Sequence, residues 1–393
     1  MGFFRVVLVS LFVVVFFYLS HQLTRFADLS LGMVSIVNLG LISILGIVLA
    51  QPLYFWSDRR LEHRPWHDSF SRVAHLCMAY INFLISFVIL RDVAAFALEY
   101  LAPAYSTEFA FGKEALGIML TLPLFLILLG TLVVRVGPRV THVALGFKNL
   151  PKGLENLRIL HITDLHISSS LPVHFVEKLV QRVNKLKPDL VVYTGDILDS
   201  QAIRHLAEFD SLKKMESRLG HYYVPGNHEY YWDVDQGLAA FRSVDFNVLI
   251  NETANLTINN SLLQISGIPD PAARMFRKEE PDFEKVAAQL KPEGFKLLLS
   301  HQPSLAKQAC KKGFDLQLSG HTHGGQFFPW NLLIGFFERY SKGLYRIQGM
   351  QLYVNQGTGY WGPSLRLGTY CELTVITLTS NVSILRRGRS AKR

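Results

Sequence analysis

The chain has 393 residues, of which 49% are hydrophobic, and its mean hydropathy is +0.21. This length allows two or three domains, and the hydrophobic content and mean hydropathy are high for a purely soluble protein. The formal net charge of +9 comes without any RNA- or DNA-binding motif. Because much of the basic charge lies near apolar segments, we expect no nucleic-acid partner.

The N-terminal part contains four apolar segments, at about 2–20, 31–56, 76–100 and 115–136. Each is close to the roughly 20 residues that cross a bilayer. The first segment also fits a cleaved signal peptide, because Arg5 precedes it, but no small-residue cleavage site follows, so a retained span is favoured. We therefore predict an integral, multi-pass membrane protein with a transmembrane region over residues 1–136.

Basic residues beside these segments predict the orientation of the chain. Those in the second loop and after the fourth segment are Arg59, Arg60, Arg64, Arg72, Arg135, Arg139, Lys148 and Lys152, whereas the other two loops offer Arg25 and Lys113. The positive-inside rule then puts both termini and the C-terminal domain on the cytoplasmic face. Glycosylation triplets at Asn251, Asn255, Asn259 and Asn381 are the competing, lumenal signal. The cysteines, Cys77, Cys310 and Cys371, form no evident disulfide framework and weakly favour the cytoplasm.

Arg91 and Asp92 are adjacent charges inside the third apolar segment. Charges in a bilayer are costly and are usually paired within a helix bundle. We interpret them as a structural pair or a break in the span, in preference to a transport site.

From about residue 150 onward, short β-rich segments alternate with helical patterns, which predicts an α/β domain. We expect helices near 171–186, 201–219 and 303–312, and successive strands over 343–385. The predicted domain covers 155–385, after a linker at 137–154 and before a basic tail at 386–393. That tail either contacts anionic headgroups or is a solvated end.

Polar residues follow five of the predicted strands directly. Asp164 and His166 follow 158–163, Asp196 follows 190–195, Asn227 and His228 follow 221–226, His301 follows 296–300, and His321 and His323 follow 315–320. In open α/β sheets, ligands gather outside the carboxyl ends of the strands, so these residues are expected to meet in one place. The candidate metal ligands are Asp164, His166, Asp196, Asn227, His301, His321 and His323. Each motif alone is weak evidence, and a lone His301 is more often a core residue, but chance explains their common order poorly.

These motifs resemble the calcineurin-like metallophosphoesterase superfamily, whose signature is D-x-H, G-D-x-x-D, G-N-H-D/E, a histidine and G-H-x-H. The match covers about 155–380 in order. More narrowly, the sequence is similar to the membrane-associated YkuE-type and YaeI-type branch, through the stretch from Gly320 to Gln326 and the late segment 357–368. The resemblance implies a four-layer α/β/β/α metallophosphoesterase sandwich after the four-helix transmembrane region.

The resemblance also implies two divalent metal ions bridged by Asp196. One would be held by Asp164, His166, Asp196 and His323, and the other by Asp196, Asn227, His301 and His321. A nitrogen and oxygen donor set without thiolates suits Mn, Fe or Zn better than Mg, and we expect Mn first.

The activity implied is hydrolysis of phosphodiester or pyrophosphate bonds by a hydroxide that bridges the two metals. His228 is the expected proton donor to the leaving-group oxygen, and Asp199 would orient its imidazole. We expect Glu229 to contact the metal ligands from outside or to form the turn, in preference to binding a metal directly.

Four spans are not needed to cleave a soluble ester, so the fusion suggests a lipid-linked substrate and contact with membrane lipids; soluble diesters rank next. The apolar segment 327–337 either dips into lipid or packs on the protein. The alternative functions are a catalytically weak metal-binding sensor or regulatory domain on a membrane bundle, and a transporter.

Overall fold

The computed structural model describes residues 2–25, 27–55, 65–104 and 106–382. The chain divides into two compact units, Met1–Leu132 with Gly362–Leu365, and Val133–Trp361 with Arg366–Arg393. The predicted basic tail, 386–393, and the loop residues Arg59, Arg60 and Arg64 lie outside the described residues.

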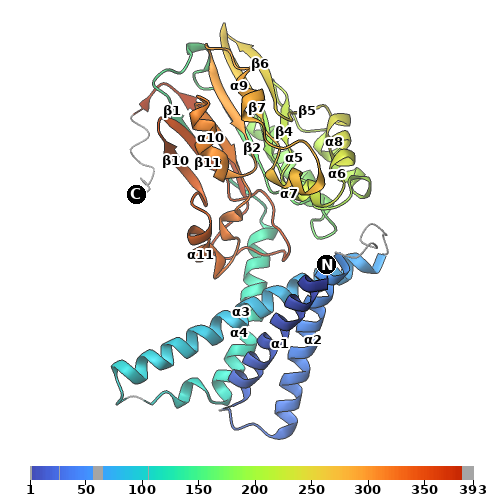
Figure 1. Ribbon diagram of the computed structural model, residues 1–393, viewed down its shortest axis with the longest axis vertical. Helices are drawn as coiled ribbons and strands as arrows, with labels where there is room; N and C mark the ends of the chain where they lie inside the picture. Colours follow the sequence, from blue (N-terminus) through green and yellow to red (C-terminus); the bar gives the residue numbers. More distant parts are fainter. Residues whose placement is uncertain (1, 26, 56–64, 105, 383–393) are drawn as a thin grey trace. The chain divides into compact units, whose positions relative to one another are not determined.

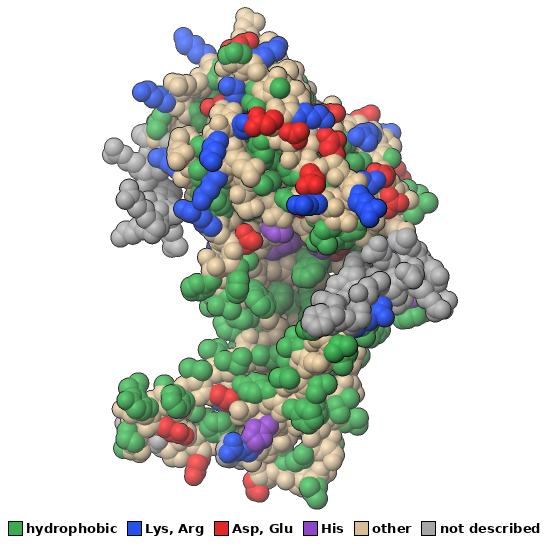
Figure 2. Space-filling model, in the orientation of Figure 1, with side chains coloured by type: hydrophobic (Ala, Val, Ile, Leu, Met, Phe, Trp, Pro, Cys, Tyr) green, Lys and Arg blue, Asp and Glu red, His purple; other side chains and the backbone are tan. Residues whose placement is uncertain are grey.

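Four long helices make up the N-terminal unit: α1 (Gly2–Thr24), α2 (Leu31–Phe55), α3 (Pro65–Leu101) and α4 (Lys113–Arg135), which continues into the second unit (Figure 1). All four are long and apolar enough to cross a membrane. Figure 2 shows hydrophobic side chains over most of the visible surface of these helices, whereas charged side chains gather on the C-terminal unit. The predicted spans are present as helices, although α3 begins well before residue 76.

The charged pair on α3 is satisfied by other groups of the N-terminal unit. Arg91 donates to Asp92 Oδ1 from Nε at 2.9 Å and from Nη2 at 2.7 Å, and Nη2 also reaches the Gln22 carbonyl at 3.0 Å. The Tyr18 hydroxyl donates to Asp92 Oδ2. This arrangement agrees with the structural pair expected from the sequence, because each charge has hydrogen-bonding partners on the neighbouring helix α1.

Two six-stranded sheets form the centre of the C-terminal unit. The first has the order β1-β12-β2-β3-β4-β5, with β1 (Arg139–Gly146), β12 (Glu372–Thr379), β2 (Arg158–Ile162), β3 (Leu190–Thr194), β4 (His221–Val224) and β5 (Phe246–Val248). The second has the order β10-β11-β9-β8-β7-β6, with β10 (Gly343–Ile347), β11 (Met350–Val354), β9 (Leu316–Ser319), β8 (Phe295–Leu299), β7 (Ser261–Gly267) and β6 (Glu252–Ile258). Strands β2 to β5 are parallel, as are β7 to β9 with β11.

Alternating side chains of the strands build a four-layer sandwich. On β2, Ile159 belongs to the core between the sheets, whereas Leu160 belongs to the core on the outer face of the first sheet. Helices α5 (Val173–Leu186), α6 (Leu206–Leu212) and α8 (Val234–Ser243) cover that outer face (Figure 1). Helices α9 (Phe283–Ala287) and α10 (Ala306–Lys311) contribute to the core on the outer face of the second sheet. The predicted α/β/β/α fold is therefore confirmed.

Two parts of the fold differ from the sequence expectation. The segment predicted as a linker, 137–154, contains β1, which pairs in parallel with β12 from the far end of the domain. Most of β1 is partly exposed, so its sequence lacks the continuous apolar pattern of a central strand. The expected helix over 201–219 is a 3-10 turn (Ala202–Arg204) followed by the short α6.

Candidate metal centre

Every predicted metal-ligand residue lies in a loop or turn that follows the carboxyl end of a strand. Asp164 and His166 follow β2, Asp196 follows β3, Asn227 begins the short helix α7 (Asn227–Tyr231) after β4, His301 follows β8, and His321 and His323 follow β9. Because β2 to β4 run in parallel, as do β8 and β9, their carboxyl ends meet at one edge of each sheet. The two edges together bring all seven residues to one place.

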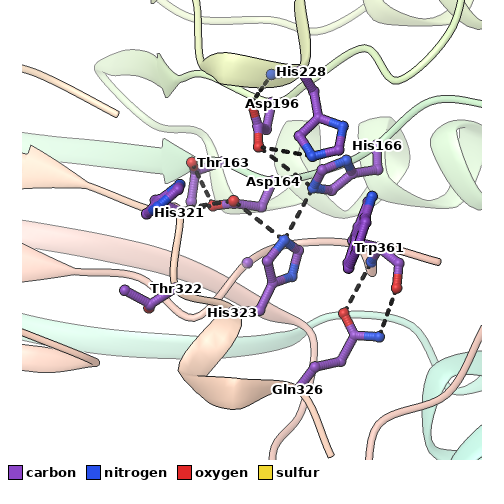
Figure 3. Close-up of polar contacts among 12 residues, drawn as sticks. Thr163, Asp164, His166, Asp196, His228, His321, Thr322, His323, Gln326 and Trp361 are labelled. Atoms are coloured by element: carbon purple, nitrogen blue, oxygen red, sulfur yellow. Dashed lines mark hydrogen bonds and ion pairs between the residues drawn. The ribbon is translucent and has the colours of Figure 1, made fainter. Parts of the chain in front are cut away.

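One group of donor atoms comes from Asp164, His166 and His323, whose side chains converge (Figure 3). The two Nε2 atoms of His166 and His323 are 3.0 Å apart, and His323 Nε2 is 3.4 Å from Asp164 Oδ1. Asp196 Oδ2 lies 3.8 Å from His166 Nε2. Nitrogen and carboxylate donors that face one another at these distances suit a divalent cation of the Mn, Fe or Zn type.

A second group surrounds the side-chain oxygen of Asn227. His301 Nε2 and His321 Nδ1 each lie 3.1 Å from Asn227 Oδ1 and 3.2 Å from one another. His301 Nε2 is also 3.2 Å from Asp196 Oδ2. The same Asp196 oxygen thus faces both groups, as expected of a carboxylate that bridges two cations.

The electrostatics of the centre favour positive charge. Burial raises the pKa of Asp164, and repulsion from Asp196 adds to that rise. Burial also opposes ionisation of Asp196, but the neighbouring His301 and His228 hold the pKa of Asp196 well below its usual range. Burial lowers the pKa of His323, and the nearby His166 and Arg366 lower it further, which keeps this imidazole neutral. Burial also lowers the pKa of His301, but the carboxylates of Asp196 and Asp164 outweigh burial and hold that pKa well above its usual range. Buried acids and imidazoles that shift one another's pKa at close range fit a cation site, because metal ions compete with protons for these same atoms.

Comparison with known proteins is consistent with this donor set. The sequence model of the calcineurin-like phosphoesterase family matches residues 157–325. The chain is 31% identical over 355 residues to a Bos taurus transmembrane protein with metallophosphoesterase domain, which covers 84% of this chain and 78% of that protein. The chain belongs to the calcineurin-like metallophosphoesterase family.

Other relatives match a shorter part of this metallophosphoesterase. A Danio rerio transmembrane protein with metallophosphoesterase domain is 36% identical over 250 residues, 61% of this chain and 57% of that protein. The uncharacterized metallophosphoesterase YkuE of Bacillus subtilis is 30% identical over 242 residues, 59% of this chain and 82% of that protein. The chain spans 57 to 64% of the length of three of the curated relatives it matches.

The backbone of this metallophosphoesterase is left-handed at most of the predicted metal-ligand positions. The φ angles of Asp164, His166, Asp196, His321 and His323 are 50°, 53°, 52°, 74° and 51°. Such a turn redirects the chain directly after a strand. Gly226 and Gly320 allow the loops to approach one another, because an added Cβ would lie 2.2 Å from Asp196 Oδ1 and 2.1 Å from Asp164 Oδ2.

Backbone groups orient several of these side chains. The Nδ1 of His301 lies 2.7 Å from the carbonyl oxygen of Thr194, which can only accept, so Nδ1 carries a proton and Nε2 is directed toward Asn227 and Asp196. Asp164 accepts from the backbone N–H of His321 at 3.0 Å, and Asp196 Oδ1 accepts from the N–H of His228 at 2.9 Å. The donor atoms are thereby fixed without a cation.

His228 and Asp199 form a pair beside the metal-ligand groups. His228 Nδ1 donates to Asp199 Oδ1 at 2.7 Å, and Trp232 Nε1 donates to the same oxygen at 3.1 Å. Burial lowers the pKa of His228, but the carboxylates of Asp199 and Asp196 outweigh burial and raise that pKa to about 9. The other nitrogen, Nε2, is 4.0 Å from Asp196 Oδ2 and is the one available to a substrate.

The carboxylate of Glu229 holds two of the loops together. It accepts backbone N–H groups from Asp196 at 3.0 Å, Ile197 at 2.8 Å, Leu198 at 2.9 Å and Gly226 at 2.8 Å. Four donors occupy its oxygens, so its contacts are those of the turn-forming residue expected from the sequence.

Sequence reasoning gave no role to Arg366 or Gln326, although both contact the metal-ligand loops. Arg366 is fully buried and donates to the carbonyl oxygens of His323 at 3.1 Å and Gly359 at 2.8 Å. Gln326, three residues after His323, makes two hydrogen bonds to Trp361. Both residues lie in the segments that carry the narrower family resemblance, Gly320 to Gln326 and 357–368, and that resemblance is the available signal.

Proposed function

We propose that this chain is a membrane-anchored phosphoesterase that uses two divalent metal ions to hydrolyse phosphodiester or pyrophosphate bonds, including those of lipid-linked substrates. The observation that carries the proposal is the position of Asp196, one oxygen of which faces His166 of one donor group and His301 of the other. One cation would be held by Asp164, His166, Asp196 and His323, and the other by Asp196, Asn227, His301 and His321. The donor set favours Mn, with Fe or Zn as alternatives.

Bound divalent cations supply Lewis-acid activation of water and of phosphoryl oxygens. The chain itself supplies the proton for the leaving group. As the oxygen of water bonds to phosphorus, the bond to the leaving oxygen breaks, and that oxygen takes the bonding electrons and the proton of His228 Nε2. The proton lost by water returns to His228 through solvent. Asp199, hydrogen-bonded to Nδ1, keeps Nε2 directed toward the reacting bond.

The proposal is tested by metal removal from the purified full-length protein. Treatment with a chelator should abolish hydrolysis of bis(p-nitrophenyl) phosphate, and added Mn²⁺ should restore it. Bound cations attract the anionic diester and activate water, whereas the metal-free carboxylates repel the diester. Metal content measured in parallel separates the alternatives. A protein that binds two Mn²⁺ ions and shows no turnover with any diester or pyrophosphate would be a sensor, and the proposed activity would be wrong.

Helix α11 (Trp330–Phe337) supports the lipid-linked class of substrate. It follows the G-H-x-H motif, and its Leu332, Phe336 and Phe337 side chains are 65%, 84% and 72% exposed. The basic residues Arg339 and Lys342 after it are also exposed. Exposed aromatic residues with basic neighbours are typical of helices that lie at a membrane surface. Phe327, at the start of the segment predicted to enter lipid, is buried and belongs to the protein interior.

Replacing Phe336 and Phe337 together by glutamine should lower hydrolysis of a lipid-linked diester in liposomes about tenfold, because the helix loses apolar area that partitions into the bilayer. Hydrolysis of bis(p-nitrophenyl) phosphate by the same variant should stay within about twofold. The matched control is Leu206→Gln, which changes an exposed apolar residue on α6. Equal losses on the lipid-linked and soluble substrates would contradict the role of α11.

We also infer that the catalytic unit faces the cytoplasm, on the positive-inside pattern of Arg72, Arg135, Arg139, Lys148 and Lys152. The glycosylation triplet at Asn251, which would favour a lumenal domain, is weakened as a signal because the residue is buried. Asn251 is fully buried, and its amide donates to Glu279 and to the Glu280 carbonyl, so it is not placed to accept a glycan. Protease protection of sealed vesicles measures the orientation directly.

A further inference from the structure

An exposed tryptophan lies beside the proton donor of the proposed reaction. The indole ring of Trp361 is 5.8 Å from the imidazole of His228, at an interplanar angle of 69°. Trp361 is 47% exposed, so much of its ring surface is available to a ligand. Because His228 is the residue that would touch the leaving oxygen, a group attached to that oxygen lies within reach of the indole.

Trp361 is held in place through its backbone by one glutamine side chain. Gln326 Nε2 donates to the Trp361 carbonyl at 2.8 Å, and the Trp361 N–H donates to Gln326 Oε1 at 2.9 Å (Figure 3). Gln326 is itself 6% exposed, and its own backbone N–H donates to the His323 carbonyl at 3.0 Å. Gln326 therefore links the backbone of Trp361 to the turn that carries His323, a predicted metal ligand. An exposed residue without a function would not need this link.

The rings continue along the protein from Trp361. His228 is 5.1 Å from the ring of Tyr231, and Tyr231 is 6.1 Å from Phe276. Tyr231 and Phe276 are partly exposed. We call Trp361, His228, Tyr231 and Phe276 the aromatic row. A row of partly exposed rings offers flat apolar area to a ligand, and flat aromatic groups make the largest contact with such area.

We propose that Trp361 determines specificity for the leaving group, which packs as a planar aromatic ring, such as a nucleobase or an aryl group, against the indole. Gln326 is a positioning residue that acts through Trp361. The inference rests on the proposed function, because the leaving group is defined by the proton that His228 donates. The inference narrows the substrate class to diesters or pyrophosphates whose leaving group contains an aryl ring or a nucleobase.

The test measures binding of two phosphonate probes to the Mn²⁺-loaded full-length protein by calorimetry. Benzylphosphonate and cyclohexylmethylphosphonate, called the phenyl and cyclohexyl probes, carry the same charge and differ in whether the ring is planar. Both join the ring to phosphorus through carbon, so the proposed activity does not cleave them. Trp361→Leu should weaken binding of the phenyl probe about tenfold and change binding of the cyclohexyl probe by less than about twofold, because stacking is lost while apolar contact is kept. Trp361→Phe should recover part of the loss. Trp66→Leu, at a tryptophan of similar exposure (54%) on α3, should bind both probes as the unmodified protein does.

Gln326→Leu should weaken binding of the phenyl probe in the same direction, because Trp361 loses both hydrogen bonds. The double variant with Trp361→Leu should be no weaker than Trp361→Leu alone, since both changes act through one ring. Equal loss for the two probes, or loss for neither, would overturn the inference, and continued hydrolysis of bis(p-nitrophenyl) phosphate would leave the proposed function standing. A protein that neither binds the probes nor hydrolyses the diester would overturn both.

Discussion

The Asp196→Asn variant is expected to lose hydrolysis by a factor on the order of 10³ or more and to bind fewer than two metal ions. Asparagine keeps the shape of the side chain but removes the charge that faces both donor groups. Only one side-chain oxygen remains, and the Asp196 oxygens already serve His301, His166 and the N–H of His228. Metal analysis and turnover of bis(p-nitrophenyl) phosphate measure the two losses.

The stability of the metal-free proteins distinguishes loss of metal binding from loss of the fold. Without cations, burial opposes ionisation of Asp196, but His301, His228 and His166 hold the pKa of this carboxyl well below its usual range, so the ionised side chain stabilises the folded metal-free protein. The chelator-treated Asp196→Asn variant should therefore still unfold cooperatively, at a lower temperature than the unmodified protein. Asp210→Asn, at an exposed position of α6, is the matched control and should keep metals and activity. Full metal content and turnover in the Asp196→Asn variant would contradict the two-metal assignment.

The His228→Gln variant is expected to keep both metals and to lose turnover by about 10²- to 10⁴-fold for poor leaving groups. The loss should be small for p-nitrophenolate, which leaves without a proton, and should grow as the pKa of the leaving alcohol rises. The measurement is therefore the dependence of log kcat on leaving-group pKa, which should be steeper in the variant.

Two further variants complete this test. Asp199→Asn should show the same steeper dependence with a smaller loss, because His228 is still present but is no longer oriented or charge-stabilised. His142→Gln, at an exposed position of β1, is the control and should show neither effect. A uniform loss across all leaving groups in His228→Gln would assign His228 to metal or phosphate binding and not to proton donation.

The donor residues could be located from sequence because their positions depend on local rules. Asp164, Asp196 and His301 each follow an apolar run that forms a buried parallel strand, and such strands place their carboxyl ends together. The roles of the residues stay predictions, but the structure gathers them into two groups that both face Asp196.

Contacts set by the tertiary fold could not be predicted from local patterns. The position of β12 between β1 and β2, parallel to one and antiparallel to the other, depends on strands more than 200 residues apart in the sequence. Trp361 reaches His228 only because Gln326 fixes a loop that comes from a different part of the chain. The spacing of apolar residues along the sequence does not predict such a contact.

The left-handed backbone at five predicted metal-ligand residues has an evolutionary consequence. Each such residue costs about 1 kcal/mol relative to glycine, so the five together are a large part of the roughly 5 to 15 kcal/mol by which a domain is stable. Selection for metal binding is then one reason that side chains are retained at these turns. Glycine at position 164 or 196 would relieve the backbone strain but would also remove the side-chain oxygens that accept the N–H groups of His321 and His228, so these positions are held both by the turn and by the loops they join.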